Sequence, residues 1–247
     1  MTLAEPPERQ RIYGPRTAAK SEPIPTVSFD EWRSYFARKW NQGEHVTILG
    51  HTGSGKTTVA FEILPIRRFV LALASKPRDR LIDTAKTNGF HVAKEWPIDF
   101  RLYPYNVLWP KIAKVEDLRT QQAVFGRCLH DVYRVGGWTL YMDEVRYLGE
   151  TLRLRKLLEL LWLQGRSNDI SIVATSQRPA WIPLEAYQSA DHLFMFRESD
   201  MRNLQRLREI GGVVRDRLAY DLQRIPKHDC IYVNSRDGEM YRFNVRK

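Results

Sequence analysis

The stretch at residues 50–57 constrains the fold of this chain more than any other part. It reads Gly-His-Thr-Gly-Ser-Gly-Lys-Thr and fits the pattern G-x-x-x-x-G-K-S/T at every fixed position. A short apolar run at residues 46–49 precedes it, and residues 57–64 follow with a helical pattern. A chance glycine-rich turn would not need this strand–loop–helix context. The sequence therefore predicts a phosphate-binding loop (P-loop) in an α/β fold.

The residue types in this loop suit a nucleoside triphosphate with a magnesium ion. Glycines let successive backbone N–H groups point inward at phosphate oxygens, and the N-terminus of the next helix adds its dipole. Lys56 would reach the β- and γ-phosphates, and the Thr57 hydroxyl would bind Mg²⁺. We therefore expect ATP and Mg²⁺ as cofactors. The expected nucleotide-binding residues are Gly50, His51, Thr52, Gly53, Ser54, Gly55, Lys56, Thr57 and Thr58.

A second motif lies at residues 138–144, where an apolar run ends in Asp143-Glu144. An apolar strand that ends in an acidic residue is the Walker B pattern, in which Asp143 would hold Mg²⁺ through water. The adjacent Glu144 would orient and activate the water that attacks the γ-phosphate. The pattern is common alone, but it gains weight when it follows a complete P-loop.

A third strand pattern, at residues 169–175, runs into Ser176, Gln177 and Arg178. A polar side chain at the tip of this strand can lie between the Mg²⁺ site and the γ-phosphate. We therefore expect Gln177 to sense the γ-phosphate. The alternative is that Gln177 only satisfies the backbone of its loop.

The rest of the chain is expected to form an extended N-terminal arm, residues 1–26, and a single P-loop ATPase domain, residues 27–247. Prolines among charged residues indicate the arm, although a tail without function is the alternative. Ser28 and Glu31 form a capping box before an aromatic helix face, which favours core packing over base stacking. Further strands are expected at residues 68–74, 101–108 and 191–197, helices at 79–87, 115–135, 152–163, 199–210 and 213–222, and a closing hairpin at 230–234 and 239–245.

Charge and cysteine content narrow the function classes. The chain has 39 Lys and Arg residues against 29 Asp and Glu residues, which gives a formal net charge of +10. This charge favours polyanionic partners, and nucleic acid is the first candidate. The alternative is a basic surface without such a partner. No apolar run suits a membrane span or a signal peptide. Cys128 and Cys230 make no disulfide framework. We therefore expect a cytoplasmic protein with reduced, buried cysteines, in a host cell or in a virion if a virus encodes it.

Together these motifs resemble the FtsK–HerA superfamily of DNA-pumping ATPases. The resemblance rests on residues 50–57, 140–144 and 165–179, and residues 70–77 are also similar to the second strand of that superfamily. It implies a RecA-like (ASCE) parallel sheet flanked by helices, with the Gln177 strand between the P-loop and Asp143 strands. It also implies a homo-oligomeric ring, usually a hexamer, with ATP at each subunit interface. An arginine from the neighbouring subunit would complete the site: Arg166 is the first candidate and Arg178 the second, and a surface role is equally compatible with either.

The predicted function is an ATP-driven translocase of double-stranded DNA. The single-domain length is more similar to the genome-packaging ATPases of viruses with internal membranes than to membrane-tethered pumps, so capsid or membrane-vertex proteins are further expected partners. A motor of this kind should grip phosphates rather than read bases. Arg153, Arg155 and Lys156 could face the DNA channel, or they could be the solvated face of a leucine-rich helix.

Three alternatives remain open at this point. A helicase-type motor of the same superfamily would share every motif, and the sequence does not separate pumping from unwinding. A P-loop nucleotide or small-molecule kinase must exclude water, so a water-activating Glu144 argues against it. A regulatory or structural module that assembles on ATP would not need the complete set of Lys56, Thr57, Asp143 and Glu144.

Overall fold

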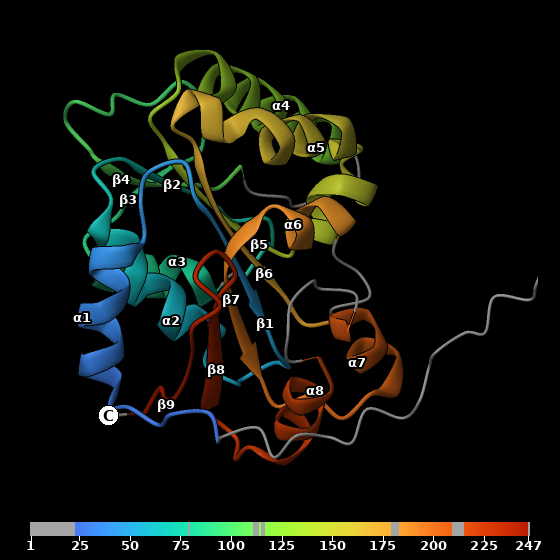
Figure 1. Cartoon of the computed structure of the whole chain (residues 1–247). Coiled ribbons are helices and arrows are strands. Elements are labelled where there is room, and N and C mark those ends of the chain that lie inside the picture. Colours follow the sequence, from blue (N-terminus) through green and yellow to red (C-terminus); the bar gives the residue numbers. More distant parts are fainter. Residues whose placement is uncertain are drawn as a thin grey trace, which may run out of the picture.

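A nine-stranded sheet runs through the computed structural model of the protein, in the order β3-β4-β2-β5-β6-β1-β7-β8-β9 (Figure 1). The structure describes residues 23–78, 80–110, 114, 117–178, 183–208 and 215–246. The strands from β3 to β7 pair in parallel, and β8 and β9 pair antiparallel at the edge. This confirms the predicted α/β class with a closing hairpin, and β6 lies between β1 and β5 as the resemblance implies.

The strands are β1 (His45–Leu49), β2 (Val70–Leu73), β3 (His91–Ala93), β4 (Tyr105–Leu108), β5 (Thr139–Asp143), β6 (Ser171–Ser176), β7 (Ala190–Phe196), β8 (Asp229–Asn234) and β9 (Met240–Asn244). Every residue of β1, β2, β6 and β7 is buried. Burial on both faces explains why these strands read as continuous apolar runs rather than as alternating patterns.

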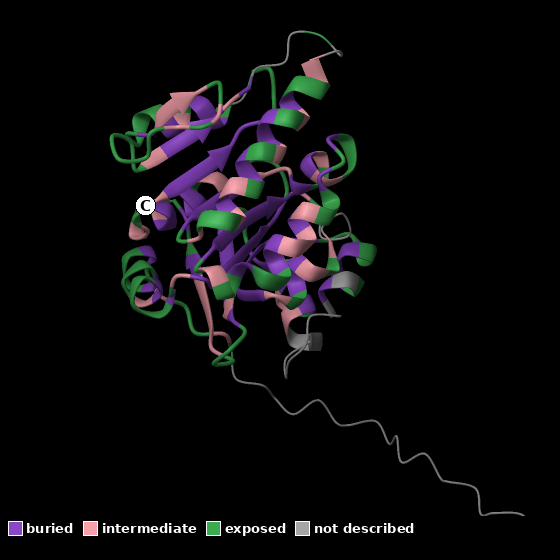
Figure 2. Cartoon of the chain, turned by 90° about the horizontal axis from the view of Figure 1, so that it is seen from above, coloured by how far each residue is buried: buried purple, intermediate pink, exposed green. Residues whose placement is uncertain are grey.

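Helices cover both faces of the sheet. The first face carries α1 (Phe29–Lys39), α2 (Lys56–Ile63) and α3 (Arg80–Thr87), and the second carries α4 (Asp117–Val135), α5 (Arg155–Gln164), α6 (Leu184–Gln188), α7 (Met201–Arg208) and α8 (Arg215–Arg224). Short helical turns lie at Leu64–Ile66, Tyr147–Thr151 and Gly165–Asn168. One apolar cluster lies under each layer of helices, so the buried strands form the centre of the molecule (Figure 2).

Helix α1 begins as the sequence predicts. The Ser28 hydroxyl accepts the backbone N–H of Glu31, and the Glu31 carboxylate accepts the backbone N–H of Ser28. Its aromatic face is buried, and the Trp32 ring stacks on Phe243 of β9 with ring centroids 4.3 Å apart. The aromatic face therefore packs in the core and is not a platform for bases.

Several predicted elements need correction. The helix expected at residues 152–163 begins only at Arg155, because Arg153 has a φ of 55° and cannot continue a right-handed helix. The strand expected at residues 101–108 is limited to Tyr105–Leu108, and the short edge strand His91–Ala93 was not predicted. Residues 1–22 of the expected arm and residues 209–214 of the expected C-terminal helices lie outside the described residues.

The last residues of the expected arm lie along β9. The Pro25 carbonyl accepts the backbone N–H of Arg242 at 2.8 Å, and the Val27 N–H donates to the Arg242 carbonyl at 2.9 Å. Residues 23–26 therefore cover part of an edge that would otherwise expose unpaired backbone groups. None of the helices in the described part of the chain has the length and apolarity that a membrane span requires.

Candidate nucleotide-binding and catalytic site

The three sequence motifs meet at one edge of the sheet. Gly50 follows β1, Glu144 follows β5 and Gln177 follows β6, and these neighbouring strands run in parallel. Their register places Leu49 beside Ser176 and Asp143 beside Thr175. The carboxyl edge of an open parallel sheet is where α/β proteins bind ligands, and the chain delivers all its predicted catalytic side chains except Arg166 to this edge.

The P-loop has the backbone geometry that its glycines predict. Gly55 has a φ of 120°, and a Cβ atom at that position would lie 2.5 Å from the Cγ2 atom of Val245. At Gly50 a Cβ atom would lie 2.7 Å from the Cβ atom of Phe196. Side chains at either position would therefore collide with β7 or with the segment after β9. Helix α2 begins directly after Gly55, so its N-terminal N–H groups face the loop.

Lys56 is buried within the curl of this loop. Its Nζ atom donates to the carbonyls of Gly50 at 2.7 Å and His51 at 3.0 Å. Burial lowers the pKa of the Lys56 ammonium, Asp143 and Glu144 oppose that shift, and the charge of Lys76 adds to it. The ammonium therefore lies among oxygen acceptors, where phosphate oxygens would be favourable partners.

A chain of hydrogen bonds joins the P-loop to the predicted base. The Thr52 hydroxyl donates to Oε1 of Gln177 at 3.0 Å, and Nε2 of Gln177 donates to Oε1 of Glu144 at 2.6 Å. Asp143 accepts the Thr175 hydroxyl at 2.6 Å. Gln177 therefore touches side chains of two motifs, which favours the sensor interpretation over simple satisfaction of its own loop.

Glu144 has an unusual backbone conformation. Its φ of 63° lies in the left-handed region, which non-glycine residues seldom adopt outside constrained sites. This conformation follows directly on the last residue of β5 and turns the carboxylate toward Gln177. The sequence shows only an acidic pair, so this local geometry could not be predicted from it.

Lys76 is a site residue that the sequence analysis missed. It follows β2, the neighbour of β5, and its Nζ atom lies 3.4 Å from Oδ2 of Asp143 and 3.3 Å from Oε1 of Glu144. Residues 70–77 were expected only as the second strand and its end, and no role was given to the lysine there. The sequence signal that could have indicated Lys76 is a lysine just after the end of a further buried strand.

A cavity of about 600 Å³ unites these residues. Ligand pockets in proteins commonly have volumes of ~300 to ~1,000 Å³. The cavity is lined by Thr52, Gly53, Lys56, Thr57, Lys76, Arg78, Arg80, Leu81, Thr84, Asp143, Glu144, Ser176 and Gln177.

This donor set fits Mg·ATP. Thr57 and Asp143 line the same cavity. Within the P-loop, the buried Ser54 hydroxyl, which lines a smaller pocket on the other side of the loop, has no hydrogen-bond partner among the described residues. In the described part of the chain, no group of three or more His, Cys, Asp or Glu side chains could hold a metal ion. Mg²⁺ suits such a site because it commonly takes one or two protein oxygens and completes its shell with phosphates and water.

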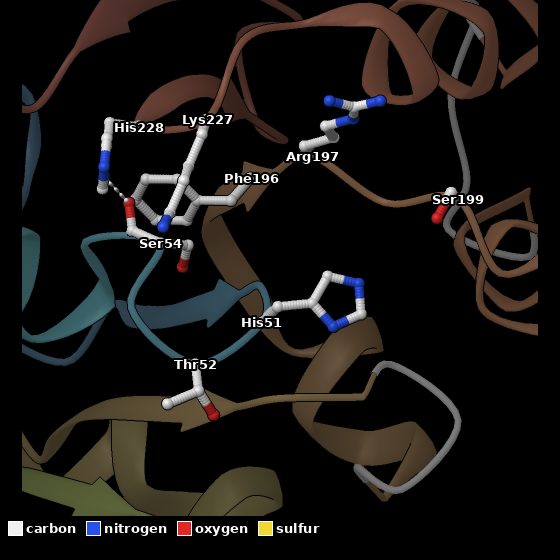
Figure 3. Close-up of a pocket in the computed structure, with 8 residues that line it drawn as sticks. All are labelled: His51, Thr52, Ser54, Phe196, Arg197, Ser199, Lys227 and His228. Atoms are coloured by element: carbon white, nitrogen blue, oxygen red, sulfur yellow. Dashed lines mark hydrogen bonds between the residues drawn. The ribbon is translucent and has the colours of Figure 1, made fainter.

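Two smaller pockets flank the P-loop. One, of about 280 Å³, opens between the loop and the end of β7 and is lined by His51, Thr52, Ser54, Phe196, Arg197, Ser199, Lys227 and His228 (Figure 3). The other, of about 280 Å³, holds Thr58 together with Gly53, Gly55, Lys56, Thr57, His228, Val245 and Arg246. His51, Ser54 and Thr58 therefore face these pockets rather than the large cavity, although all three were predicted nucleotide-binding residues.

His51 contacts a carboxylate. Its Nε2 atom lies 3.4 Å from Oε1 of Glu198, a buried residue that also accepts the backbone N–H groups of Ser199 and Asp200 before α7. The P-loop is thereby joined to the start of α7.

The predicted arginine fingers lie at opposite edges of the sheet. Arg166 precedes β6 and pairs with Asp191 at the start of β7, at the amino edge, so it cannot reach the P-loop of its own chain. Arg178 directly follows Gln177 at the carboxyl edge, and its side chain is exposed. Of the predicted DNA-contacting residues, Arg155 pairs with Glu159, and Arg153 and Lys156 are exposed at the start of α5.

Comparison with known proteins gives one sequence relative and a group of similar folds. No family model matches the chain. The DNA packaging ATPase P9 of Enterobacteria phage PRD1 is 28% identical over 170 residues, which cover 67% of this chain and 69% of P9.

Three solved structures have similar folds at low sequence identity. The genome packaging NTPase B204 of Sulfolobus turreted icosahedral virus 2, in complex with AMPPCP, has a TM-score of 0.61 and 12% identity, covering 82% of this chain and 97% of B204. B204 of Sulfolobus turreted icosahedral virus, the DNA-packaging ATPase, has a TM-score of 0.59 and 15% identity over 82% of this chain and 98% of its own. VirB4 of Thermoanaerobacter pseudethanolicus has a TM-score of 0.58 and 10% identity, covering 82% of this chain and 89% of VirB4. In sequence and in fold, the chain is similar to the viral genome-packaging P-loop ATPases of the FtsK–HerA type.

Proposed function

We propose that this chain is the ATPase subunit of a viral genome-packaging motor, which hydrolyses ATP to move double-stranded DNA. The observation that carries the proposal is the Thr52–Gln177–Glu144 chain of hydrogen bonds, which joins the P-loop to a water-activating carboxylate. The similarity to P9 and B204, both named as packaging ATPases, and the net charge of +10 support the choice of DNA as the substrate.

In this proposal the P-loop N–H groups and Lys56 bind the triphosphate. Thr57 and Asp143 would hold Mg²⁺, which neutralises charge on the β- and γ-phosphates when bound. Glu144 takes the proton of the water that attacks the γ-phosphate. Gln177 contacts the P-loop at Thr52 and the base at Glu144, so it is placed to couple the state of the γ-phosphate to the base.

The oligomer is also part of the proposal. We expect a ring, usually of six subunits in the superfamily that the chain resembles, in which an arginine of one subunit stabilises charge in the site of the next. Arg166 would exchange its pair with Asp191 for the neighbour's γ-phosphate, and Arg178 is the second candidate. Capsid or membrane-vertex proteins would be the docking partners, and the motor would act in the host cytoplasm or in the virion.

The domain division stays a proposal as well. Residues 27–247 would act as one P-loop ATPase domain, because the two apolar clusters draw side chains from elements between α1 and β9. Residues 1–26 would form an arm.

Steady-state ATP hydrolysis with long duplex DNA, with single-stranded DNA and without DNA tests the function. Stimulation by duplex DNA that fades as salt rises is expected, because counterion release makes phosphate contacts salt-dependent. A kinase would leave ATP turnover indifferent to DNA and raise it with a small acceptor. A helicase would respond to a single-stranded end, and an assembly module would bind ATP without turnover.

A further inference from the structure

The two oxygens of the Glu144 carboxylate have different surroundings. Oε1 accepts the amide of Gln177 at 2.6 Å and lies 3.3 Å from Nζ of Lys76. The structure gives Oε2 no hydrogen-bond or ion-pair partner among the described residues. The Glu144 side chain is 25% exposed, so water can reach it. Two donors thus hold one oxygen and leave the other available.

Hydrogen bonds to the backbone at residues 75 and 76 fix the position of Lys76. Its carbonyl accepts the indole N–H of Trp109 at 2.9 Å, and the preceding Ser75 carbonyl accepts the amide of Gln121 at 3.1 Å. Gln121 is buried and also accepts the hydroxyl of Tyr147, three residues after Glu144, at 2.7 Å. The segments that follow β2 and β5 are therefore both hydrogen-bonded to the Gln121 side chain, which limits the movement of Lys76 relative to Glu144.

The two adjacent carboxylates of Asp143 and Glu144 are stabilised by a nearby cation. Asp143 and Glu144 are adjacent carboxylates, and two like charges in one site repel each other. Lys76 lies within 3.4 Å of one oxygen of each. Lys56 is turned toward the carbonyls of its own loop, so Lys76 is the ammonium that contacts both acidic side chains.

We propose that Lys76 is a positioning residue for ATP hydrolysis: with Gln177 it holds Oε1 of Glu144, so that Oε2 faces the attacking water. In the step that this arrangement serves, the water oxygen forms a bond to the γ-phosphorus. The bond from that phosphorus to the β,γ-bridging oxygen breaks, and its electron pair stays on ADP. The proton of the water passes to Oε2 of Glu144. Lys76 takes no part in bond making, and the inference rests on the proposed ATPase function.

The test compares Lys76→Met with Lys86→Met, which removes an exposed lysine of α3 outside the site. A poorly placed base costs about 10- to 100-fold in rate. We expect kcat of Lys76→Met to fall by that factor, with the Kd of a fluorescent ATP analogue within about threefold of the unaltered protein. Lys76→Arg should restore part of kcat, because it returns the charge but not the same geometry. Lys86→Met should change neither quantity.

A second pair of variants tests whether Lys76 acts through Glu144. In a Glu144→Gln background there is no carboxylate base to place, so adding Lys76→Met should change the residual single-turnover rate less than about twofold, the non-additivity expected of groups that work as one unit. Three results would each overturn the inference. The first is an unchanged kcat in Lys76→Met, and the second is an equal loss of rate in the unaltered and Glu144→Gln backgrounds. The third is a lost affinity for the ATP analogue with a normal kcat at saturating ATP.

The outcome also separates this inference from the proposed motor function. All these rates are measured without DNA. A chain that hydrolyses ATP with no response to duplex DNA would contradict the motor and still report on Lys76. A duplex-stimulated ATPase with normal kcat in Lys76→Met would contradict the positioning role alone. A protein that never hydrolyses ATP would contradict both.

Discussion

At the scale of single residues, the central group is the Glu144 carboxylate. It combines a left-handed backbone, a hydrogen bond from Gln177 and contact with Lys76. Asp143 beside it shares the contact with Lys76, but its hydrogen bond comes from the Thr175 hydroxyl, and it lines the same cavity as Thr57. The two adjacent carboxylates thus have different hydrogen-bond donors, Thr175 for Asp143 and Gln177 for Glu144, which supports the proposal that one holds the metal and the other takes the proton.

Glu144→Gln should separate ATP binding from hydrolysis. The amide keeps the size of the side chain but cannot take a proton, and general base catalysis contributes about 10²- to 10⁴-fold. We expect nucleotide affinity within a few-fold of the unaltered protein and hydrolysis reduced at least about 100-fold, measured by single-turnover release of phosphate. Glu150→Gln, at an exposed carboxylate paired with Arg146, is the matched control. Normal hydrolysis in Glu144→Gln would mean that another group is the base.

His45 should make the stability of the fold depend on pH. It is buried, its Nδ1 atom accepts the backbone N–H of Ile172, and its Nε2 atom faces the carbonyl of Trp162. Burial lowers the pKa of His45 to about 4, with a smaller contribution from Arg166, while Asp191 and the Trp162 carbonyl oppose the shift. The His45 ring is therefore neutral in the folded protein above about pH 4.

The sign follows from where the proton binds. Between about pH 6.5 and pH 4 the unfolded chain takes up a proton at His45 that the folded protein does not, so the free energy of unfolding should fall by up to about 3 kcal/mol as pH drops through this window. Urea unfolding at several pH values measures this slope. His45→Gln should flatten it, whereas His130→Gln, at an exposed position on α4, should retain it. An equal slope in His45→Gln would assign the effect to another group.

At the scale of elements, the capping box of α1 offers a local test. Ser28→Ala removes the acceptor for the Glu31 N–H, and loss of such a cap costs about 1 kcal/mol. Ser34→Ala, at an exposed position inside the same helix, should be neutral or slightly stabilising because alanine favours helix. Chemical denaturation measures both variants. Equal effects of the two would show that the cap does not stabilise α1 in the folded protein.

Elements with strong local signals could be predicted from the sequence, and those set by tertiary contacts could not. The P-loop, β5 and β6 follow from apolar runs that end in characteristic residues, and the closing hairpin follows from two alternating runs on either side of residues 235–238. Strand β3 has three half-buried residues and pairs only with β4, so it has no pattern of its own. The left-handed Arg153 shortens α5, and nothing in a leucine-rich run indicates that.

The candidate site shows the same division. Lys56, Thr57, Asp143 and Glu144 are indicated by motifs, since each follows a recognisable strand or glycine pattern. Lys76 is not, because its position depends on β2 lying beside β5 in the sheet. The place of β2 beside β5 became visible only in three dimensions.

At the scale of the whole molecule, the two edges of the sheet carry different parts of the proposed catalytic site of a ring. The carboxyl edge carries the candidate nucleotide site, and the amino edge carries the Arg166–Asp191 pair. A site completed by Arg166 therefore requires a second copy of the chain, whose amino edge faces the first copy's cavity.

Mixing two inactive variants tests this arrangement. Lys56→Ala should lose ATP binding, and Arg166→Ala should keep binding but lose hydrolysis by roughly 10³-fold or more. In a mixture, a Lys56→Ala subunit can lend its intact Arg166 to the intact site of an Arg166→Ala subunit, so part of the activity should return. Asp191→Asn controls for loss of the ion pair and should leave hydrolysis largely intact. Absence of recovery in assembled mixtures would move the assignment to Arg178.

The most direct measurement of the central claim is displacement of a third DNA strand from a long linear duplex. A motor that moves along duplex DNA should release a fluorescent triplex-forming strand when ATP is added and leave the duplex paired. Glu144→Gln should release none at the same protein concentration. Release that requires ATP would support the packaging motor. Active, duplex-stimulated hydrolysis without release, or separation of the duplex strands instead, would contradict it.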